Sequence, residues 1–188
     1  MRQQYQDEAE ARTDIFIRFT YPKKLDEARE AVARLVSAPV QECVLVRNAT
    51  TGFNTVLRNL TFQHGDVMVY FDTIYGAMEK TIVSITETTP LQARKVDYDL
   101  AHLTSHEELV DRFLRTVRAA RDDGLNVKIA AFDAIVSSPG VRFPFERLTE
   151  ACRAEGVMSL VDAAHGIGQI PLDLGKLDPD FATTNCHK

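Results

Sequence analysis

The sequence predicts an α/β fold in three layers, with a mainly parallel sheet between two layers of helices. Short apolar segments of strand length alternate along most of the chain with amphipathic segments of helix length. This alternation is typical of parallel sheets, because each helix returns the chain across a face of the sheet before the next strand. Ligands of such sheets bind beyond the carboxyl ends of the strands. Polar residues directly after predicted strands are therefore the candidates for a site.

Size and composition are those of a globular protein. The chain has 188 residues, of which 45% are hydrophobic and 26% charged, and a chain of this size buries roughly 70% of its unfolded surface. The net charge of −5 gives no reason to expect a nucleic-acid partner, since such proteins usually carry a basic patch. No apolar run approaches the roughly 20 residues of a membrane span, so no membrane partner is expected.

Cysteine usage and the opening residues indicate a cytoplasmic protein. Cys43, Cys152 and Cys186 are few, odd in number and widely spaced, which argues against a disulfide framework and for a reducing compartment. The segment Met1–Asp14 is polar and mixed in charge, unlike a secretory signal.

The chain begins with a segment of helical composition, and we predict residues 1–22 as an N-terminal helical extension and residues 23–188 as one domain. A helix is predicted from Lys23 and is ended by Ala38-Pro39; its apolar stripe consists of Leu25, Ala28, Val32, Leu35 and Val36. The short apolar run at residues 43–46 is predicted to be a buried strand. Asn48 is then expected to cap a helix, whose buried face would consist of Phe53, Val56, Leu57 and Leu60.

Strands and helices then alternate to the end of the chain. In order, the pattern predicts a strand at 67–71, a helix marked by Met78, Ile82 and Ile85, a strand at 93–96, a helix with the stripe Leu109, Val110, Phe113, Leu114 and Val117, a buried strand at 127–136, a helix from Pro144, a strand at 157–161 and a last strand at 181–184.

Two candidate residues carry ionisable groups near predicted strand ends. Asp162 directly follows the strand at 157–161, where a carboxylate can meet a cationic nitrogen of a ligand; a helix cap or an ordinary loop acid explains it as well. The amine of Lys188 can attack an aldehyde once it loses its proton. Taken alone, Lys188 is more typical of a solvated surface charge.

Two further candidates follow other predicted strands. Asn48-Ala49-Thr50-Thr51-Gly52 opens a helix, where free N–H groups and threonine hydroxyls favour an anion; simple capping is an equally good explanation. The segment lacks the GxxxxGK[ST] pattern of a nucleotide P-loop. Tyr75 could stack on a planar ring, with a gain of about 1 kcal/mol, or could pack as a half-buried side chain.

Taken together, this ordered set resembles the class V aminotransferases, among them cysteine desulfurases, isopenicillin-N-epimerase-like proteins and fungal carbon–sulfur lyases. The resemblance runs from about Ala11 to Lys188 and is strongest over residues 47–57 and 161–188. Residues 137–145 are similar to the epimerase-like and lyase branch. The resemblance implies part of the large domain of a fold-type I enzyme that uses pyridoxal 5'-phosphate, an amino-acid substrate, and the homodimer of full-length relatives.

The resemblance also implies a role for each site residue. Lys188 would form the Schiff base with the cofactor aldehyde and act as the base at the substrate α carbon. Asp162 would pair with the ring nitrogen, His165 would bond the ring hydroxyl, and Tyr75 would stack on the ring. The phosphate ligands would be Thr50, Thr51, Asn185 and His187. Ser137 occupies the place where many relatives have an asparagine near the ring hydroxyl.

Zinc is the alternative for the histidine-rich end of the chain. His165, Cys186 and His187 are suitable ligand types, but neither C-x-x-C nor H-x-x-x-H spacing is present. We therefore expect no metal.

The expected activity is carbon–sulfur lysis, with epimerisation or transamination next. Full-length relatives are longer, and their C-terminal small domain is not expected in this chain. A lysine beside a free terminal carboxylate favours the protonated amine, so we expect little activity from this chain alone. The alternative is a truncated, non-catalytic remnant that binds cofactor weakly or only packs against a partner. An unrelated doubly wound binding protein would require Asp162 and Lys188 to point away from each other.

Overall fold

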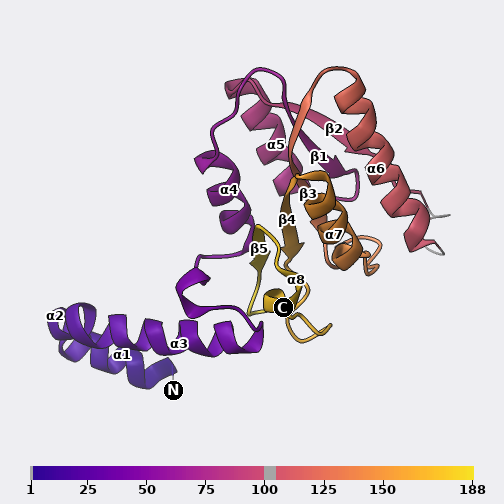
Figure 1. The fold of residues 1–188 in the computed structure, drawn as a ribbon. Helices are drawn as coiled ribbons and strands as arrows, with labels where there is room; N and C mark the ends of the chain where they lie inside the picture. Colours follow the sequence, from indigo (N-terminus) through magenta and orange to yellow (C-terminus); the bar gives the residue numbers. More distant parts are fainter. Residues whose placement is uncertain (1, 100–104) are drawn as a thin grey trace. The chain divides into compact units, whose positions relative to one another are not determined.

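The computed structural model describes residues 2–99 and 105–188, and the chain divides into two compact units, Met1–Leu45 and Val46–Lys188 (Figure 1). Residue 1 and residues 100–104, which belong to the two predicted domains, lie outside the described residues. The domain boundary between residues 22 and 23 stays a prediction.

The first unit is helical, as the composition of its opening predicted. Its elements are α1 (Arg2–Ala11), α2 (Thr13–Ile15), the π-helix η1 (Phe16–Thr20), α3 (Tyr21–Leu35) and the 3-10 helix η2 (Val40–Glu42). The helix predicted from Lys23 is therefore confirmed as α3. Its predicted apolar stripe is only partly buried, because Leu25 and Leu35 are exposed.

The buried strand predicted at residues 43–46 is wrong. Among the residues that the model describes, this segment pairs with no strand, and Val44 is 76% exposed. A strand needs a neighbour to which its N–H and C=O groups can bond. A short apolar run does not reveal by itself whether that neighbour exists.

The second unit contains a parallel sheet with the order β2-β1-β3-β4-β5 in the described part of the chain. The strands are β1 (Asp66–Phe71), β2 (Gln92–Val96), β3 (Asn126–Asp133), β4 (Met158–Ala163) and β5 (Phe181–Thr184). β3 lies beside β1 on the side opposite β2, so the direction of strand addition reverses at β1.

Helices cover both faces of this sheet (Figure 1), which confirms the three-layer α/β prediction. α4 (Ala49–Asn59) and α5 (Gly76–Thr88) pack on one face, and α6 (His106–Asp122) and α7 (Phe145–Glu155) pack on the other. The short helix α8 (Leu174–Leu177) precedes β5. Within the described residues, no helix is both long and apolar enough to cross a lipid bilayer.

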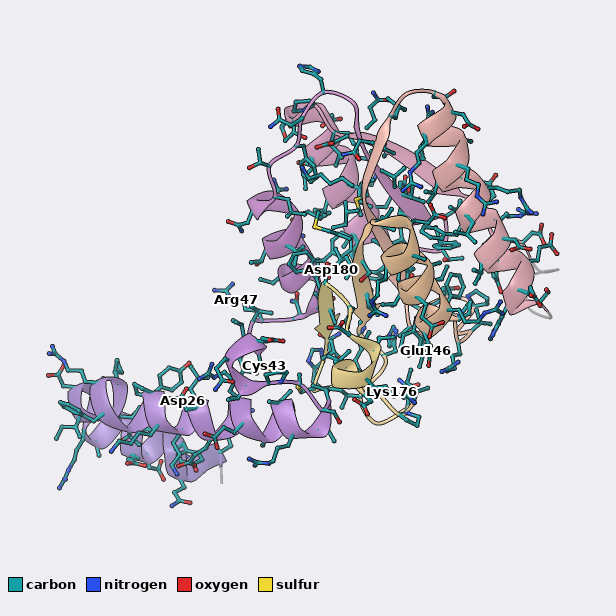
Figure 2. All side chains as sticks on the ribbon, in the orientation of Figure 1. Asp26, Cys43, Arg47, Glu146, Lys176 and Asp180 are labelled. Carbon is teal, nitrogen blue, oxygen red and sulfur yellow. The ribbon has the colours of Figure 1, made fainter. Side chains whose placement is uncertain are left out.

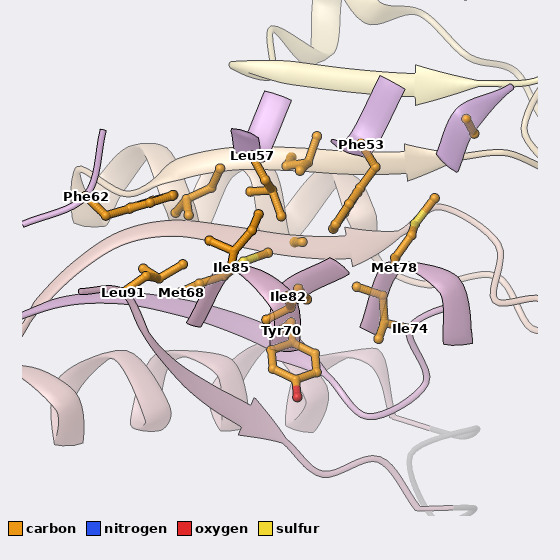
Figure 3. Close-up of a cluster of buried hydrophobic side chains, with 14 residues drawn as sticks. Phe53, Leu57, Phe62, Met68, Tyr70, Ile74, Met78, Ile82, Ile85 and Leu91 are labelled. Carbon is orange, nitrogen blue, oxygen red and sulfur yellow. The ribbon is translucent and has the colours of Figure 1, made fainter. Parts of the chain in front are cut away.

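A large apolar cluster holds α4 and α5 against the sheet (Figure 3). Phe53 and Leu57 from α4 meet Ile82 and Ile85 from α5 above alternate residues of the strands, such as Met68. Each such side chain contributes roughly 1.5–3 kcal/mol on burial. Asn48 caps α4 as expected, because its side chain accepts the Thr51 N–H at 2.8 Å.

Two strand ends differ from their predicted positions. β3 ends at Asp133 rather than at Val136, since Ile135 already forms an isolated antiparallel bridge with Arg142. β4 continues through Asp162 to Ala163, so Asp162 lies inside the strand rather than after it. Asp133 and Asp162 are consequently neighbours in register on adjacent strands.

Candidate functional site

The carboxyl ends of β3, β4 and β5 and the first turn of α4 surround a pocket of about 190 Å³. The pocket collects residues that are far apart in the sequence, from Asn48 to Lys188. Most of the site residues predicted from the sequence line it: Thr50, Tyr75, Ser137, Asp162, His165, Asn185, His187 and Lys188. Thr51 is the predicted site residue that is not among the lining residues.

Asp162 is a buried carboxyl group on the wall of this pocket, 3% exposed. Its Oδ1 atom accepts the N–H of Ala164 at 2.9 Å. Burial raises the pKa of Asp162, while the bond from the Ala164 N–H and, in their protonated forms, His165 and Lys188 act in the opposite direction. A cation placed beside this group would therefore be stabilised by a carboxylate that water screens little.

Lys188 and His165 contact each other in the pocket. The Lys188 Nζ atom lies 3.1 Å from His165 Nε2, and His165 Nδ1 lies 3.4 Å from the Ile135 carbonyl oxygen. A carbonyl only accepts hydrogen bonds, so this arrangement favours the tautomer with the proton on Nδ1. Nε2 is then free to accept a hydrogen bond from the Lys188 amine.

The first turn of α4 is tied to the end of β5 by Asn185. The Asn185 Oδ1 atom accepts the Ala49 N–H at 2.9 Å, and its Nδ2 donates to the Ala164 carbonyl at 3.4 Å. Asn185 is buried, so its side chain holds the helix start in place. The predicted contact of Asn185 with a phosphate stays a prediction.

The two threonines of this turn differ in their surroundings. Thr51 directs both its N–H and its hydroxyl to Asn48 Oδ1, at 2.8 and 3.1 Å, so its polar groups are engaged by the residue that caps the helix, and Thr51 does not line the pocket. Thr50 does line the pocket. The positive end of the helix dipole and Thr50 are the features of this turn that would favour an anion.

Gly52 allows α4 to approach the sheet closely. A Cβ atom at this position would lie only 2.9 Å from Thr183 Cγ2 on β5. The glycine in Thr50-Thr51-Gly52 is thus explained by packing of the helix on the strand that leads to Lys188.

Tyr75 and Ser137 line the pocket from loops. Tyr75 precedes α5 and is 48% exposed, which leaves its ring available to a planar ligand. Ser137 is an exposed residue four positions after the end of β3. Neither arrangement assigns a function by itself.

Asp133 is a pocket residue that the sequence analysis missed. It ends β3, is 3% exposed, and lies in register with Asp162. The sequence pattern placed it inside a longer strand, 127–136, and so hid it among buried residues. The rule that identified Asp162, an acid at the carboxyl end of a strand, would have found Asp133 if the strand end had been known.

Within the described residues, no three side chains of histidine, cysteine, aspartate or glutamate gather in a geometry that could hold a metal ion. Cys152 is buried, and burial raises its thiol pKa to about 12. Cys43 is half-buried and Cys186 is exposed.

Comparison with known proteins places the chain in a family. The family model for aminotransferase class-V matches residues 3–188. The L-cysteine desulfhydrase-like protein lolT1 of Epichloe uncinata is 45% identical over 179 residues, which are 95% of this chain and 39% of that protein. The hercynylcysteine sulfoxide lyase of Schizosaccharomyces pombe is 29% identical over 183 residues, 96% of this chain and 44% of the relative.

A solved structure supports the same fold. The cystine C–S lyase C-DES, in complex with its product cysteine persulfide, superposes with a TM-score of 0.75 at 20% identity, over 90% of this chain and 44% of that chain. The chain thus spans about two fifths of the length of these proteins. The family match covers nearly all of the sequence, and the chain therefore belongs to the aminotransferase class-V family.

Proposed function

We propose that the pocket binds pyridoxal 5'-phosphate and that the protein uses it to break a carbon–sulfur bond of a cysteine-type amino acid. The observation that carries this proposal is the convergence of Asp162, His165 and Lys188 on one pocket that also contains the start of α4. When bound, the cofactor supplies an electron-accepting ring that stabilises negative charge at the substrate α carbon.

The groups present fit each chemical part of this cofactor. The buried Asp162 carboxylate suits a cationic ring nitrogen, and the Lys188 amine suits an aldehyde. Thr50 and the N-terminus of α4 suit a phosphate. The half-exposed ring of Tyr75 can stack on a planar ring, and Ser137 and His165 offer polar atoms to its hydroxyl.

The contact between His165 and Lys188 supports the role of the lysine. With its proton on Nδ1, His165 accepts a hydrogen bond from the amine at Nε2 and so orients Nζ within the pocket. A neutral amine held in this way would be suited to hold the cofactor through its aldehyde and, whenever it is free, to take a proton from the substrate α carbon. We assign both roles to Lys188.

The choice of carbon–sulfur lysis rests on the relatives. Their names describe a desulfhydrase-like protein, a sulfoxide lyase and a cystine C–S lyase. Epimerisation and transamination come next, because both also begin with removal of the α proton. We further propose that residues 23–188 are part of the family's large domain and residues 1–22 an extension, that the protein acts as a homodimer, and that it is cytoplasmic.

The test is covalent capture of the cofactor. Purified protein is incubated with pyridoxal phosphate, reduced with borohydride and digested, and the modified lysine is identified by mass spectrometry. We expect the adduct on Lys188, its loss in Lys188→Ala, and its retention in Lys176→Ala, which removes an exposed lysine of α8 (labelled in Figure 2). Modification spread over surface lysines would contradict cofactor binding in this pocket.

The reaction is tested separately, by release of sulfide from L-cysteine and from S-substituted cysteines. Sulfide release that disappears in Lys188→Ala supports the lyase. Exchange of the α proton without sulfide release would point to epimerisation instead. Capture on Lys188 with neither reaction would favour the non-catalytic alternative.

A further inference from the structure

Asp133 and Asp162 form a pair of buried acids that the proposed function uses only in part. Parallel pairing in register places Asp133 on β3 beside Asp162 on β4, and Asp162 beside Thr183 on β5. Residues paired in this way project on the same face of a sheet, and adjacent strands lie only about 4.8 Å apart. All three are buried, with exposures of 3%, 3% and 7%. Both acids line the pocket.

The two acids differ in what surrounds their oxygens. Asp162 receives the Ala164 N–H at 2.9 Å, and it lines the same pocket as His165 and Lys188. Asp133 Oδ2 is buried and has no hydrogen-bond partner in the described part of the chain. A charge on an oxygen without a donor is costly in a protein interior, so negative charge is better placed on Asp162.

The titratable groups around the pair also favour placing the negative charge on Asp162. From β4 the group that faces Asp133 is Asp162, an acid, and on the other side β1 pairs with β3 only as far as Ala131. The pocket adds His165, His187, Lys188 and Tyr75, and among these His165 and Lys188 act on Asp162. Burial and the charge of Asp162 raise the pKa of Asp133 well above its ordinary value. Two adjacent buried acids do not ionise together easily.

We propose that Asp133 is a positioning residue for Asp162: the pair holds one proton, Asp133 keeps it, and Asp162 is thereby the member that carries the negative charge toward the bound ring. A neutral Asp133 also keeps a hydrogen-bond donor inside the pocket. This inference rests on the proposed function for its purpose, but the state of the pair can be measured without any cofactor.

The first measurement is the stability of the cofactor-free protein against pH. The native state binds a proton on Asp133 that the unfolded chain releases above its ordinary pKa near 3.8. Stability therefore falls as pH rises from that value through the raised pKa of Asp133. We expect the melting temperature of the wild type to fall over this pH range. The part of this fall that depends on Asp133 should vanish in Asp133→Asn, because the asparagine stays neutral at every pH.

The matched control is Thr183→Val. Thr183 is buried and pairs in register with Asp162, but the substitution removes no titratable group. We therefore expect this variant to keep the wild-type dependence of the melting temperature on pH. The proposal would be overturned if the melting temperatures of Asp133→Asn and wild type changed with pH in the same way over about pH 4 to pH 8.

The second measurement covers the case in which Asp133→Asn does not fold. The carboxyl carbons of ¹³C-labelled wild-type protein are titrated by NMR, and the signals are assigned with Asp162→Asn. We expect one aspartate of the pair to keep its proton well above the ordinary pH range of aspartates. Ordinary titration of both acids would overturn the proposal.

The third measurement links the pair to the cofactor. We expect Asp133→Asn to bind pyridoxal phosphate within about threefold of wild type near neutral pH, since it preserves the neutral donor. A loss of tenfold or more would mean that Asp133 must be charged, and would overturn the proposal. If wild type itself binds no cofactor, the proposed function fails while the two cofactor-free measurements still decide the state of the pair.

Discussion

At the amino end of the sheet, the buried Asp66 carboxylate accepts the Gln63 N–H at 2.9 Å, the Asn126 amide at 2.7 Å and the Lys128 ammonium at 3.0 Å. At the carboxyl end, the equally buried Asp133 has an oxygen with no partner among the described residues. Asn126 and Asp133 are the first and last residues of β3, so this one strand connects the charge-compensated site around Asp66 with the pocket that contains Asp133.

The pKa values of the two aspartates move in opposite directions. Burial by itself would raise the pKa of Asp66, but the bonds from Gln63, Asn126 and Lys128 outweigh burial and lower it. Burial and the neighbouring Asp162 raise that of Asp133. The amino end thus uses its charges for stability, whereas the carboxyl end keeps polar groups available to a ligand.

The largest effect is expected from Asp162→Asn at the carboxyl end. The amide keeps the size of the side chain and an oxygen for the Ala164 N–H, but it removes the charge that we propose pairs with the ring nitrogen. We expect pyridoxal phosphate to bind about 100-fold more weakly, or about 3 kcal/mol, measured by absorbance titration. The melting temperature should not fall. A large loss of stability with unchanged cofactor affinity would show that Asp162, like Asp66, stabilises the fold and does not bind the ligand.

Lys128→Met at the amino end should do the opposite. It removes an ammonium that bonds Asp66 and, at 2.7 Å, the Thr61 carbonyl, and leaves the buried carboxylate less compensated. We expect a loss of about 2 kcal/mol in the free energy of unfolding, from urea denaturation, with unchanged cofactor affinity. Lys80→Met, at an exposed position of α5, is the control and should cost little.

Asn185→Ala tests whether the carboxyl end also contains a purely structural contact. The Ala49 N–H would lose its acceptor, and we expect a stability loss of about 1 kcal/mol. Asn185→Asp keeps an accepting oxygen and should recover part of that loss, while its negative charge should weaken the proposed binding of the cofactor phosphate. Equal stability of Asn185→Ala and wild type would show that this bond does not hold α4 in place.

The smallest expected effect is on acid unfolding. The pKa of Asp66 is lowered in the folded state, so its contribution to stability is present above the ordinary value of 3.8 and is lost as pH falls through the folded value. Asp66→Asn should be less stable than wild type at neutral pH, and this difference should shrink in acid. A difference that stays constant down to about pH 2 would contradict the role of its charge.

Local pattern was sufficient for most of the second unit. The strand at 181–184 and the helices around Phe53, Ile82 and Phe113 lie where periodicity placed them, because a fully buried strand and a one-sided helix leave different patterns of apolar residues. The prediction failed at residues 43–46, where the first unit passes into the second. This apolar run has no strand beside it in the described part of the chain, and only a neighbour can decide whether such a run pairs.

The sequence by itself determined the fold class, the family and the residue types of the pocket, because strand ends and helix starts are local features and the polar residues next to them can be read directly. The tertiary structure decided which of these residues meet. It brought His165 within 3.1 Å of Lys188, assigned Asn185 to the start of α4, and placed Asp133 beside Asp162 through the register of β3 and β4. Register depends on how separate segments pack, so no single segment contains it.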